Sequence, residues 1–267
     1  MDGLALAKAA LLGVIQGLTE FLPISSTAHL LLAQRLMGGT DEAFTVMIQL
    51  GSILAVMWLY RAKIWETAAG LPSKPEARRF ALMLLLAFLP AVFVGLLAAD
   101  FVKAVLYESF QVIAWAFILG GAAMLLLERF GPRPSIARAD ATPIGRAIGV
   151  GVFQTLALIP GVSRSGATIL GGLALGLDRR AAAGFSFFLA MPTMAAAFVH
   201  DLADVYDELT AARAAEIGVG FVMAFLSALL VVKPFLAFVT RVGFGPFGWY
   251  RIGLGVLVLV LLHFGRL

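Results

Sequence analysis

Six apolar stretches, each long enough to cross a lipid bilayer, constrain the fold of this chain more than any other feature. They cover residues 43–60, 80–99, 109–127, 182–200, 216–234 and 247–264. Because a helix rises about 1.5 Å per residue, such stretches match a hydrocarbon core roughly 30 Å thick. Charged residues make up only 13% of the chain, against about 25% in soluble domains. The sequence therefore predicts an all-α integral membrane protein with six transmembrane helices.

The sequence holds no cysteine and only three histidines, His29, His200 and His263. Disulfides, thiolate catalysis and cysteine-ligated metals are thereby excluded, and the scattered histidines lack the spacing of a zinc site. The net charge of +4 lies in short loops between the apolar stretches. We interpret these charges as topology signals and predict no nucleic-acid binding, because no extended basic face is present.

Two further apolar segments, residues 4–36 and 146–176, are interrupted by polar residues and by Pro23 and Pro160. Each pattern predicts a helix, a break at the proline and a shorter second helix. Irregular backbone at membrane depth is tolerated only where protein or water covers it. We therefore expect two re-entrant helix–loop–helix hairpins in addition to the six transmembrane helices.

The two interrupted segments are related by an internal repeat. GVIQGLTEFLPISST, which begins at Gly13, aligns without gaps onto GVFQTLALIPGVSRS, which begins at Gly151, at an offset of 138 residues. Identical residues occur at the pairs Gly13/Gly151, Val14/Val152, Gln16/Gln154, Leu18/Leu156 and Ser25/Ser163. The same offset carries the first three apolar stretches onto the last three. We predict one membrane domain, residues 1–267, with repeats at about 1–135 and about 139–267.

Each repeat holds three spans, and because three is odd the two copies are expected to insert with opposite orientations. Basic residues gather in one set of loops, at Arg61, Lys63, Lys74, Arg78, Arg79, Arg129, Arg133, Arg138, Arg146, Arg179, Arg180, Arg241 and Arg251. The opposite loops are acidic, with Asp41, Glu42, Asp100, Glu108, Asp201, Asp204, Asp207 and Glu208. The positive-inside rule places the basic loops in the cytoplasm and both termini in the periplasm. The hairpins would then enter from opposite sides, with their tips meeting near the midplane.

The second hairpin has the composition of a phosphate cradle in PGVSRSGAT, residues 160–168. Two glycines free its backbone to bend and three hydroxyls follow, at Gly161, Gly166, Ser163, Ser165 and Thr168. The helix that begins there presents unpaired N–H groups and the positive end of its dipole, and Arg164 adds a planar fork of donors. A serine that only caps the helix is the alternative interpretation. A charged arginine at membrane depth favours the anion site.

The first hairpin carries reactive groups in QGLTEFLPISSTAH, residues 16–29. These are an amide, a carboxylate, three hydroxyls and an imidazole, at Gln16, Glu20, Ser25, Ser26, Thr27 and His29. A carboxylate, a hydroxyl and an imidazole are the parts of nucleophilic or general acid–base catalysis. The alternatives are a packed His29, a Gln16 that bonds a neighbouring helix, and a purely structural ion pair between Glu20 and Arg164. The alignment places Leu158 opposite Glu20, so the two tips differ, which favours a chemical role.

GLTEFLPISSTAHL and PGVSRSGAT resemble the two signature segments of the undecaprenyl-diphosphate phosphatases, also called the bacitracin-resistance family. The resemblance covers the whole chain. It implies six spans and two re-entrant hairpins in an inverted repeat, within the bacterial inner membrane. It also implies hydrolysis of undecaprenyl diphosphate to undecaprenyl phosphate and inorganic phosphate, which recycles the lipid carrier of cell-wall synthesis. The site is expected to open towards the periplasm, and the activity to be aided by Mg²⁺ or Ca²⁺.

The catalytic residues expected from this resemblance are Glu20, Ser26, His29 and Arg164. The expected substrate-binding residues are Gln16, Ser25, Thr27, Gly161, Ser163, Ser165, Gly166 and Thr168. Gln16 stands where the family accepts glutamate or glutamine, so Glu20 is left as the candidate metal ligand. Ser26 is our choice of nucleophile, with His29 and Glu20 as acid and base. In an equally consistent version, Glu20 or His29 activates water directly and Ser26 only positions the phosphate.

Two other functions are carried as hypotheses. A polyprenyl-phosphate transporter or flippase would also use inverted repeats with broken helices, and a structural scaffold would need no chemistry. The sequence leaves the oligomeric state open, and a homodimer is compatible with it. The aromatic residues Trp58, Trp65, Trp249 and Tyr250 are interpreted as anchors at the membrane interfaces.

Overall fold

The computed structural model describes residues 3–37, 41–101, 109–206 and 209–267. Within these ranges the chain is helical, and a lone parallel bridge between Ile136 and Leu177 is its sole β pairing. Six helices are long and apolar enough to cross a membrane: α3 (Glu42–Leu59), α5 (Pro75–Phe101), α6 (Phe110–Phe130), α9 (Arg179–Val205), α10 (Ala214–Arg241) and α11 (Gly245–His263). They coincide with the six predicted stretches and confirm a multi-pass helical membrane protein.

Several of these helices extend beyond the apolar stretches that predicted them. α5 begins at Pro75, ahead of the expected start at residue 80, and α10 continues to Arg241, past residue 234. Helical hydrogen bonding persists through charged residues such as Arg78 and Arg79, which an apolar window excludes. Proline suits the start of α5 because the first helical N–H has no intrahelical partner.

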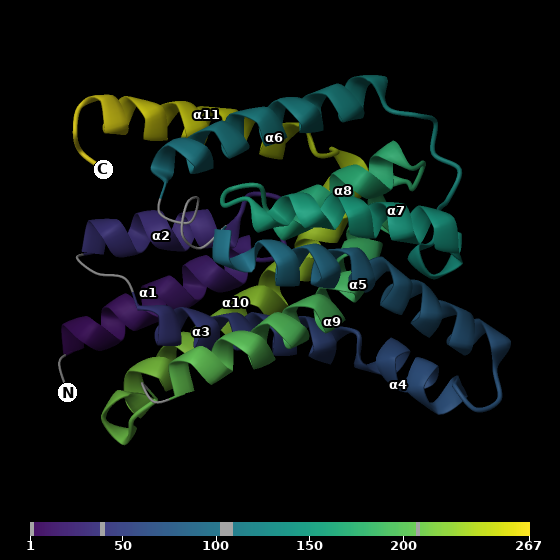
Figure 1. Cartoon of the computed structure of the whole chain (residues 1–267), viewed down its shortest axis with the longest axis horizontal. Coiled ribbons are helices and arrows are strands. Elements are labelled where there is room, and N and C mark those ends of the chain that lie inside the picture. Colours follow the sequence, from purple (N-terminus) through teal and green to yellow (C-terminus); the bar gives the residue numbers. More distant parts are fainter. Residues whose placement is uncertain (1–2, 38–40, 102–108, 207–208) are drawn as a thin grey trace.

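The two interrupted segments are helices with a break, as predicted. The first consists of α1 (Gly3–Thr19) and α2 (Ser26–Met37), and the second of α7 (Ile144–Thr155), the short 3₁₀ helix η3 (Leu156–Leu158) and α8 (Arg164–Ala174). Pro23 and Pro160 lie in the breaks, where proline removes a backbone donor and disfavours helical geometry in the residue before it. Figure 1 shows α1 and α2 in the left half of the molecule and α7 and α8 in the right half.

The helices pair in a pattern that crosses the two halves of the sequence. α1 packs against α10 and α7 packs against α5, while α6 packs along α11. A Cβ atom on Gly13 of α1 would lie 2.3 Å from the Gly220 carbonyl oxygen of α10. A Cβ atom on Gly151 of α7 would lie 2.0 Å from the Ala87 carbonyl oxygen of α5. The aligned glycines therefore allow the same close helix contact in each half, as small residues do in membranes.

The two ends of the molecule differ in their connections. Both chain termini lie at the left of Figure 1, whereas α4 (Arg61–Gly70) lies at the right. Near α4, Lys63 pairs with Asp140 at 3.3 Å, and Asp140 lies in the short helix η2 (Ala139–Ala141). A third 3₁₀ turn, η5 (Ala211–Arg213), precedes α10, and Arg213 pairs with Asp41. Of the acidic loop residues, Glu108, Asp207, Glu208 and the side chain of Asp100 lie outside the described residues.

The interpretation of Arg251 as a loop charge is wrong. Arg251 lies inside α11, and its side chain is only 1% exposed. Its guanidinium bonds backbone carbonyls in the interior, so its charge does not mark a loop. Arg251 falls within the predicted span 247–264, and bonds to backbone carbonyls allow its charge to be buried there.

Candidate active site

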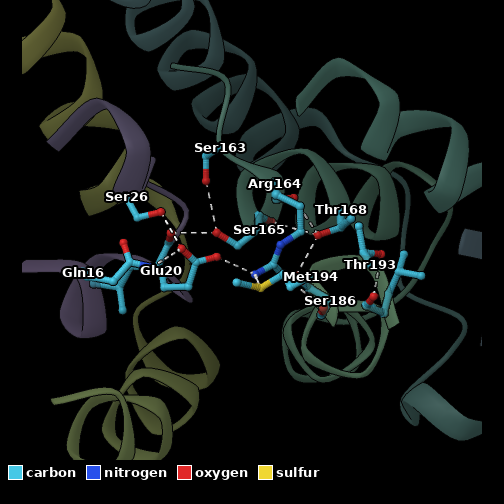
Figure 2. Close-up of polar contacts among 12 residues, drawn as sticks. Gln16, Glu20, Ser26, Ser163, Arg164, Ser165, Thr168, Ser186, Thr193 and Met194 are labelled. Carbon is cyan, nitrogen blue, oxygen red and sulfur yellow. Dashed lines mark hydrogen bonds and ion pairs between the residues drawn. The ribbon is translucent and has the colours of Figure 1, made fainter. Parts of the chain in front are cut away.

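Glu20 is the centre of the polar cluster between the two breaks (Figure 2). It follows α1 directly, is 7% exposed, and its backbone N–H still bonds the Gln16 carbonyl. Carboxylate oxygen Oε2 accepts from the Gln16 amide at 2.9 Å and from the Ser26 hydroxyl at 2.5 Å. The other oxygen, Oε1, accepts from Nη2 of Arg164 at 3.0 Å. One buried carboxylate therefore joins an amide, a hydroxyl and a guanidinium.

Arg164 begins α8 and reaches across to Glu20 from the second segment. The same Nη2 lies 3.1 Å from the sulfur of Met194, and Nη1 lies 3.4 Å from the Ser186 carbonyl, which is a long hydrogen bond. The Nε–H group is buried without a hydrogen-bond partner. A buried guanidinium donor without an acceptor is costly, so this side chain has unused capacity for an anion. Sequence reasoning predicted the meeting of Glu20 and Arg164, and the structure confirms it.

The start of α8 is held by its own hydroxyls. Ser163 caps the helix, since its Oγ accepts the Gly166 N–H at 3.1 Å, and it lies 3.1 Å from the Ser165 hydroxyl. Ser165 donates to the Leu22 carbonyl of the first segment at 2.7 Å, which is a direct link between the two breaks. Thr168 bonds the hydroxyl of Ser186 at 2.7 Å. These three hydroxyls are buried, so they fix the backbone around Arg164.

Gly161 and Ser163 give the second break its shape. Gly161 has a φ of +89°, and a Cβ atom there would lie 2.9 Å from the backbone of Ile113 in α6. Glycine is thus required both by the backbone conformation and by the close approach of α6. Ser163 has a φ of 71°, which L-residues adopt at a cost, and Ser25 in the first break has a φ of 69°.

His29 lies in the first turn of α2, and both of its ring nitrogens contact groups other than Ser26. Its Nδ1 is 2.7 Å from the Ser25 carbonyl, and its Nε2 is 2.6 Å from the hydroxyl of Tyr250 in α11. A carbonyl can only accept, so Nδ1 carries the proton, and a neutral ring accepts the Tyr250 proton at Nε2. The two rings are stacked, with centroids 5.8 Å apart.

Thr27 is half-buried beside Ser26 in the same turn.

The structure adds residues that sequence reasoning missed. Tyr250, interpreted as an interface anchor, contacts His29, and Ser186 and Met194 of α9 contact Arg164 and Thr168. Arg251 donates to carbonyls in both breaks. A charged residue within an apolar stretch was a signal for Arg251. For Ser186 and Met194 the sequence offers none, because isolated serines and methionines are common in apolar helices.

The two breaks offer few protein ligands for a divalent cation. Among the described residues, no group of three or more His, Asp or Glu side chains could hold a metal ion. Glu20 is the one carboxylate at the breaks, and its oxygens already accept from Gln16, Ser26 and Arg164. Mg²⁺ commonly uses one or two carboxylates together with substrate phosphates and water. Glu20 is therefore the one carboxylate at the breaks that would hold such a cation together with phosphate oxygens.

Fold and site together define a multi-pass helical membrane protein with a buried carboxylate–hydroxyl–guanidinium cluster between two broken helices. The chain belongs to the bacitracin resistance protein BacA family, whose family model matches residues 9–257.

Named relatives cover nearly the whole chain. An undecaprenyl-diphosphatase of Chelativorans sp. (strain BNC1) is 49% identical over 257 residues, which are 96% of each chain. One from Phenylobacterium zucineum (strain HLK1) is 51% identical over 258 residues, 96% of this chain and 97% of its own. One from Caulobacter vibrioides (strain NA1000 / CB15N) is 49% identical over 260 residues, 97% of this chain and 98% of its own. These relatives carry the name of a hydrolase, so they lend no support to the transporter alternative.

Proposed function

We propose that this chain hydrolyses undecaprenyl diphosphate to undecaprenyl phosphate and inorganic phosphate, and so recycles the lipid carrier of cell-wall synthesis. The observation that carries the proposal is the position of Glu20, whose carboxylate bonds the Ser26 hydroxyl with one oxygen and Arg164 with the other. The names of the relatives described above support the same reaction. Phosphoryl transfer needs mainly positioning and neutralisation of negative charge, and this cluster supplies both.

Arg164 is the proposed phosphate clamp. Its Nε–H has no partner and its Nη1 bond is long, so phosphate oxygens can take these donors without breaking a strong contact. The N-terminal turn of α8 adds the positive end of a helix dipole. Ser163 is positioned to contribute at this turn, whereas Ser165 and Thr168 already bond Leu22 and Ser186 and would support the clamp.

Ser26 is the proposed nucleophile and Glu20 its general base. The Ser26 hydroxyl already donates its proton towards Glu20 at 2.5 Å. Attack of Oγ on the terminal phosphorus would form the Oγ–P bond and break the bond to the bridging oxygen, which leaves as undecaprenyl phosphate. Glu20 takes the serine proton. Water then attacks the phosphoserine and breaks its Oγ–P bond. Glu20 returns its proton to Oγ of Ser26, and both water protons leave with the phosphate as dihydrogen phosphate.

The competing version has Glu20 activate water directly, with Ser26 as a phosphate ligand. It balances equally, because water supplies the oxygen and Glu20 takes its proton. The short contact between Ser26 and Glu20 favours the covalent version, because the base faces the hydroxyl. His29 is the less favoured base, since its two nitrogens contact Ser25 and Tyr250. We further propose Glu20 as the residue that would hold a divalent cation, Mg²⁺ or Ca²⁺, together with diphosphate oxygens; such a cation would supply neutralisation of phosphate charge.

We also propose that α1–α2 and α7–α8 are re-entrant hairpins of an inverted repeat in the bacterial inner membrane, with both termini periplasmic. The crossed pairing of α1 with α10 and of α7 with α5 supports the repeat. Both chain ends lie at one end of the molecule, opposite α4, which supports the topology. A homodimer would leave the site intact, because one chain supplies both Glu20 and Arg164.

Phosphate release from a C55 diphosphate by the purified protein tests the function. Ser26→Ala, Glu20→Gln and Arg164→Lys are each expected to lower kcat by about 100-fold or more. The exposed residues Ser73, Glu76 and Arg78 provide matched controls as Ser73→Ala, Glu76→Gln and Arg78→Lys. A wild-type protein that releases no phosphate would overturn the function. A fully active Ser26→Ala variant would overturn the covalent version alone.

Cysteine labelling tests the topology, because the chain contains no native cysteine. Arg266→Cys near one terminus should react with an impermeant maleimide added to intact spheroplasts. Lys74→Cys, in the turn after α4, should react only after the membrane is permeabilised. The reverse pattern would contradict periplasmic termini.

A further inference from the structure

Arg251 is a fully buried cation whose guanidinium is bonded to carbonyls alone. Its side chain is 1% exposed in the interior of α11. Nη1 donates to the carbonyls of Pro23 and Val162, each at 3.1 Å, and Nη2 donates to those of Ala116 at 2.9 Å and Gly161 at 3.0 Å. A buried charge usually has a counter-ion. The burial of an arginine that bonds only carbonyls therefore requires a structural or functional explanation.

The carbonyls that Arg251 bonds belong to the two breaks and to α6. Pro23 belongs to the first break, and Gly161 and Val162 belong to the second. Pro23 and Gly161 also align in the 138-residue repeat, so one guanidinium bonds the corresponding carbonyl of each break. Ala116 lies in α6, the helix that packs along α11. Arg251 therefore joins both breaks to the α6–α11 pair.

The chemistry of a break explains why an arginine is suited to this place. Where a helix is interrupted, as at Pro23, Gly161 and Val162, carbonyl oxygens lose their intrahelical donors, and leaving them unsatisfied in an apolar interior is costly. The planar guanidinium carries five N–H donors in a fixed fork, whereas the lysine ammonium carries three on a flexible stem. The two terminal nitrogens of Arg251 bond four carbonyls from three segments, one more acceptor than a lysine ammonium has protons, while its Nε–H stays without a partner.

We propose that Arg251 is a positioning residue for the hydrolysis reaction. It holds the two breaks at the spacing that brings Glu20, with its partner Ser26, into contact with Arg164. The inference rests on the proposed function. Arg251 bonds Pro23, three residues after Glu20, and Val162, two residues before Arg164. A shift of about 1 Å in such a spacing can lower a rate by about 100-fold.

The positive charge of Arg251 also favours binding of the diphosphate anion. Glu20 and Arg164 pair with each other, whereas the partners of Arg251 are neutral carbonyls, so Arg251 adds an uncompensated positive charge at the two breaks. The Nη1 atom lies close to Gly166, in the first turn of α8 where the diphosphate is proposed to bind. Arg251→Lys would keep this charge while losing the four-carbonyl bridge, which separates geometry from charge.

The kinetic test compares Arg251→Lys with Arg241→Lys, a matched change at an exposed arginine that ends α10. With undecaprenyl diphosphate, Arg251→Lys should lower kcat at least tenfold and change KM less than threefold, while Arg241→Lys should resemble wild type. Wild-type kcat in Arg251→Lys would overturn the positioning role. Absence of hydrolysis in the wild-type protein would instead overturn the proposed function.

A second readout does not depend on activity. Ile24→Cys places a reporter in the first break, where Ile24 is 7% exposed, and Ile53→Cys places one in the core of α3, at 1% exposure. When Arg251→Lys is combined with Ile24→Cys, maleimide should label the thiol at least tenfold faster than in Ile24→Cys alone. When it is combined with Ile53→Cys, the thiol should stay protected. Equal protection of both reporters would overturn the proposal. Labelling of both would show a general structural anchor and would overturn it too.

Discussion

Ser25 and Ser163 both adopt positive φ angles, 69° and 71°, at positions 138 residues apart in the chain. They are the two non-glycine residues of the described chain with this conformation. Each stands directly before the helix that follows its break, α2 or α8. Because the same unfavourable backbone angle recurs at aligned positions, the breaks are built alike even where their side chains differ. Strained conformations of this kind persist only where the surrounding structure holds them.

Substitution of Ser163 should separate the backbone strain from the helix cap. Ser163→Ala keeps the strain and loses the hydrogen bond from Gly166, so the free energy of unfolding should fall by about 1–2 kcal/mol. Ser163→Gly loses the same bond but relieves the positive φ, so its cost should be only a few tenths of a kcal/mol. Thermal unfolding in detergent measures both. An alanine variant as stable as the glycine variant would show that strain contributes little.

Glu20 and His29 should differ sharply in their effect on hydrolysis. Oε2 of Glu20 accepts a hydrogen bond from Oγ of Ser26 at 2.5 Å, whereas the ring nitrogens of His29 contact Ser25 and Tyr250. Glu20→Gln is therefore expected to lower kcat about 100-fold or more, and His29→Gln about tenfold or less. Steady-state phosphate release provides the comparison. If the order of the two effects is reversed, His29 is the base, and the ring must turn towards Ser26 when substrate binds.

Tyr250→Phe should affect the site without affecting the fold. Tyr250 is 45% exposed, and its hydroxyl bonds Nε2 of His29. Phenylalanine keeps the stacked ring and removes only this bond, while the Ser25 carbonyl still holds Nδ1. We expect a decrease in kcat of about fivefold or less, as loss of one hydrogen bond worth about 1 kcal/mol would give, with unchanged thermal stability. Trp249→Phe, at the neighbouring exposed residue, is the control and should leave kcat unaltered.

Asp140 provides a test of the connection between α4 and η2. Hydrogen bonds from Arg138, and then a hydrogen bond from Lys63 and the charges of both residues, hold the pKa of the Asp140 carboxyl below its usual 3.8 despite partial burial, which raises it. A lowered pKa stabilises the fold above the unfolded value, and this contribution is lost as the pH falls through the folded pKa. At pH 7 Asp140→Asn should lower stability by less than about 1 kcal/mol, because solvent screens such pairs. The difference from wild type should vanish in acid; a difference that persisted there would rule out the charge as its cause.

The six spans and the meeting of Glu20 with Arg164 could be predicted because each rests on a strong local signal. Apolar length determines the spans, and two opposite charges beside prolines in apolar sequence favour contact with each other. The role of Arg251 could not be predicted, since its partners are backbone carbonyls and no side chain in the sequence marks them. The direction of His29 likewise depends on the packing of α11, which brings Tyr250 beside it.

Two glycines of α7 should respond in opposite ways to the same substitution. Around Gly145 no atom lies within 4 Å of an added Cβ, whereas at Gly151 the Ala87 carbonyl oxygen would lie 2.0 Å away. Gly145→Ala should therefore be neutral or raise stability by about 0.5–1 kcal/mol, because alanine has the higher helix propensity. Gly151→Ala must push α7 away from α5 and should lower stability by about 1–3 kcal/mol. Because α7 leads to Arg164, Gly151→Ala should also lower the rate of phosphate release, while Gly145→Ala should leave it unchanged. Equal effects of the two substitutions would mean that close contact between α7 and α5 does not position the second break.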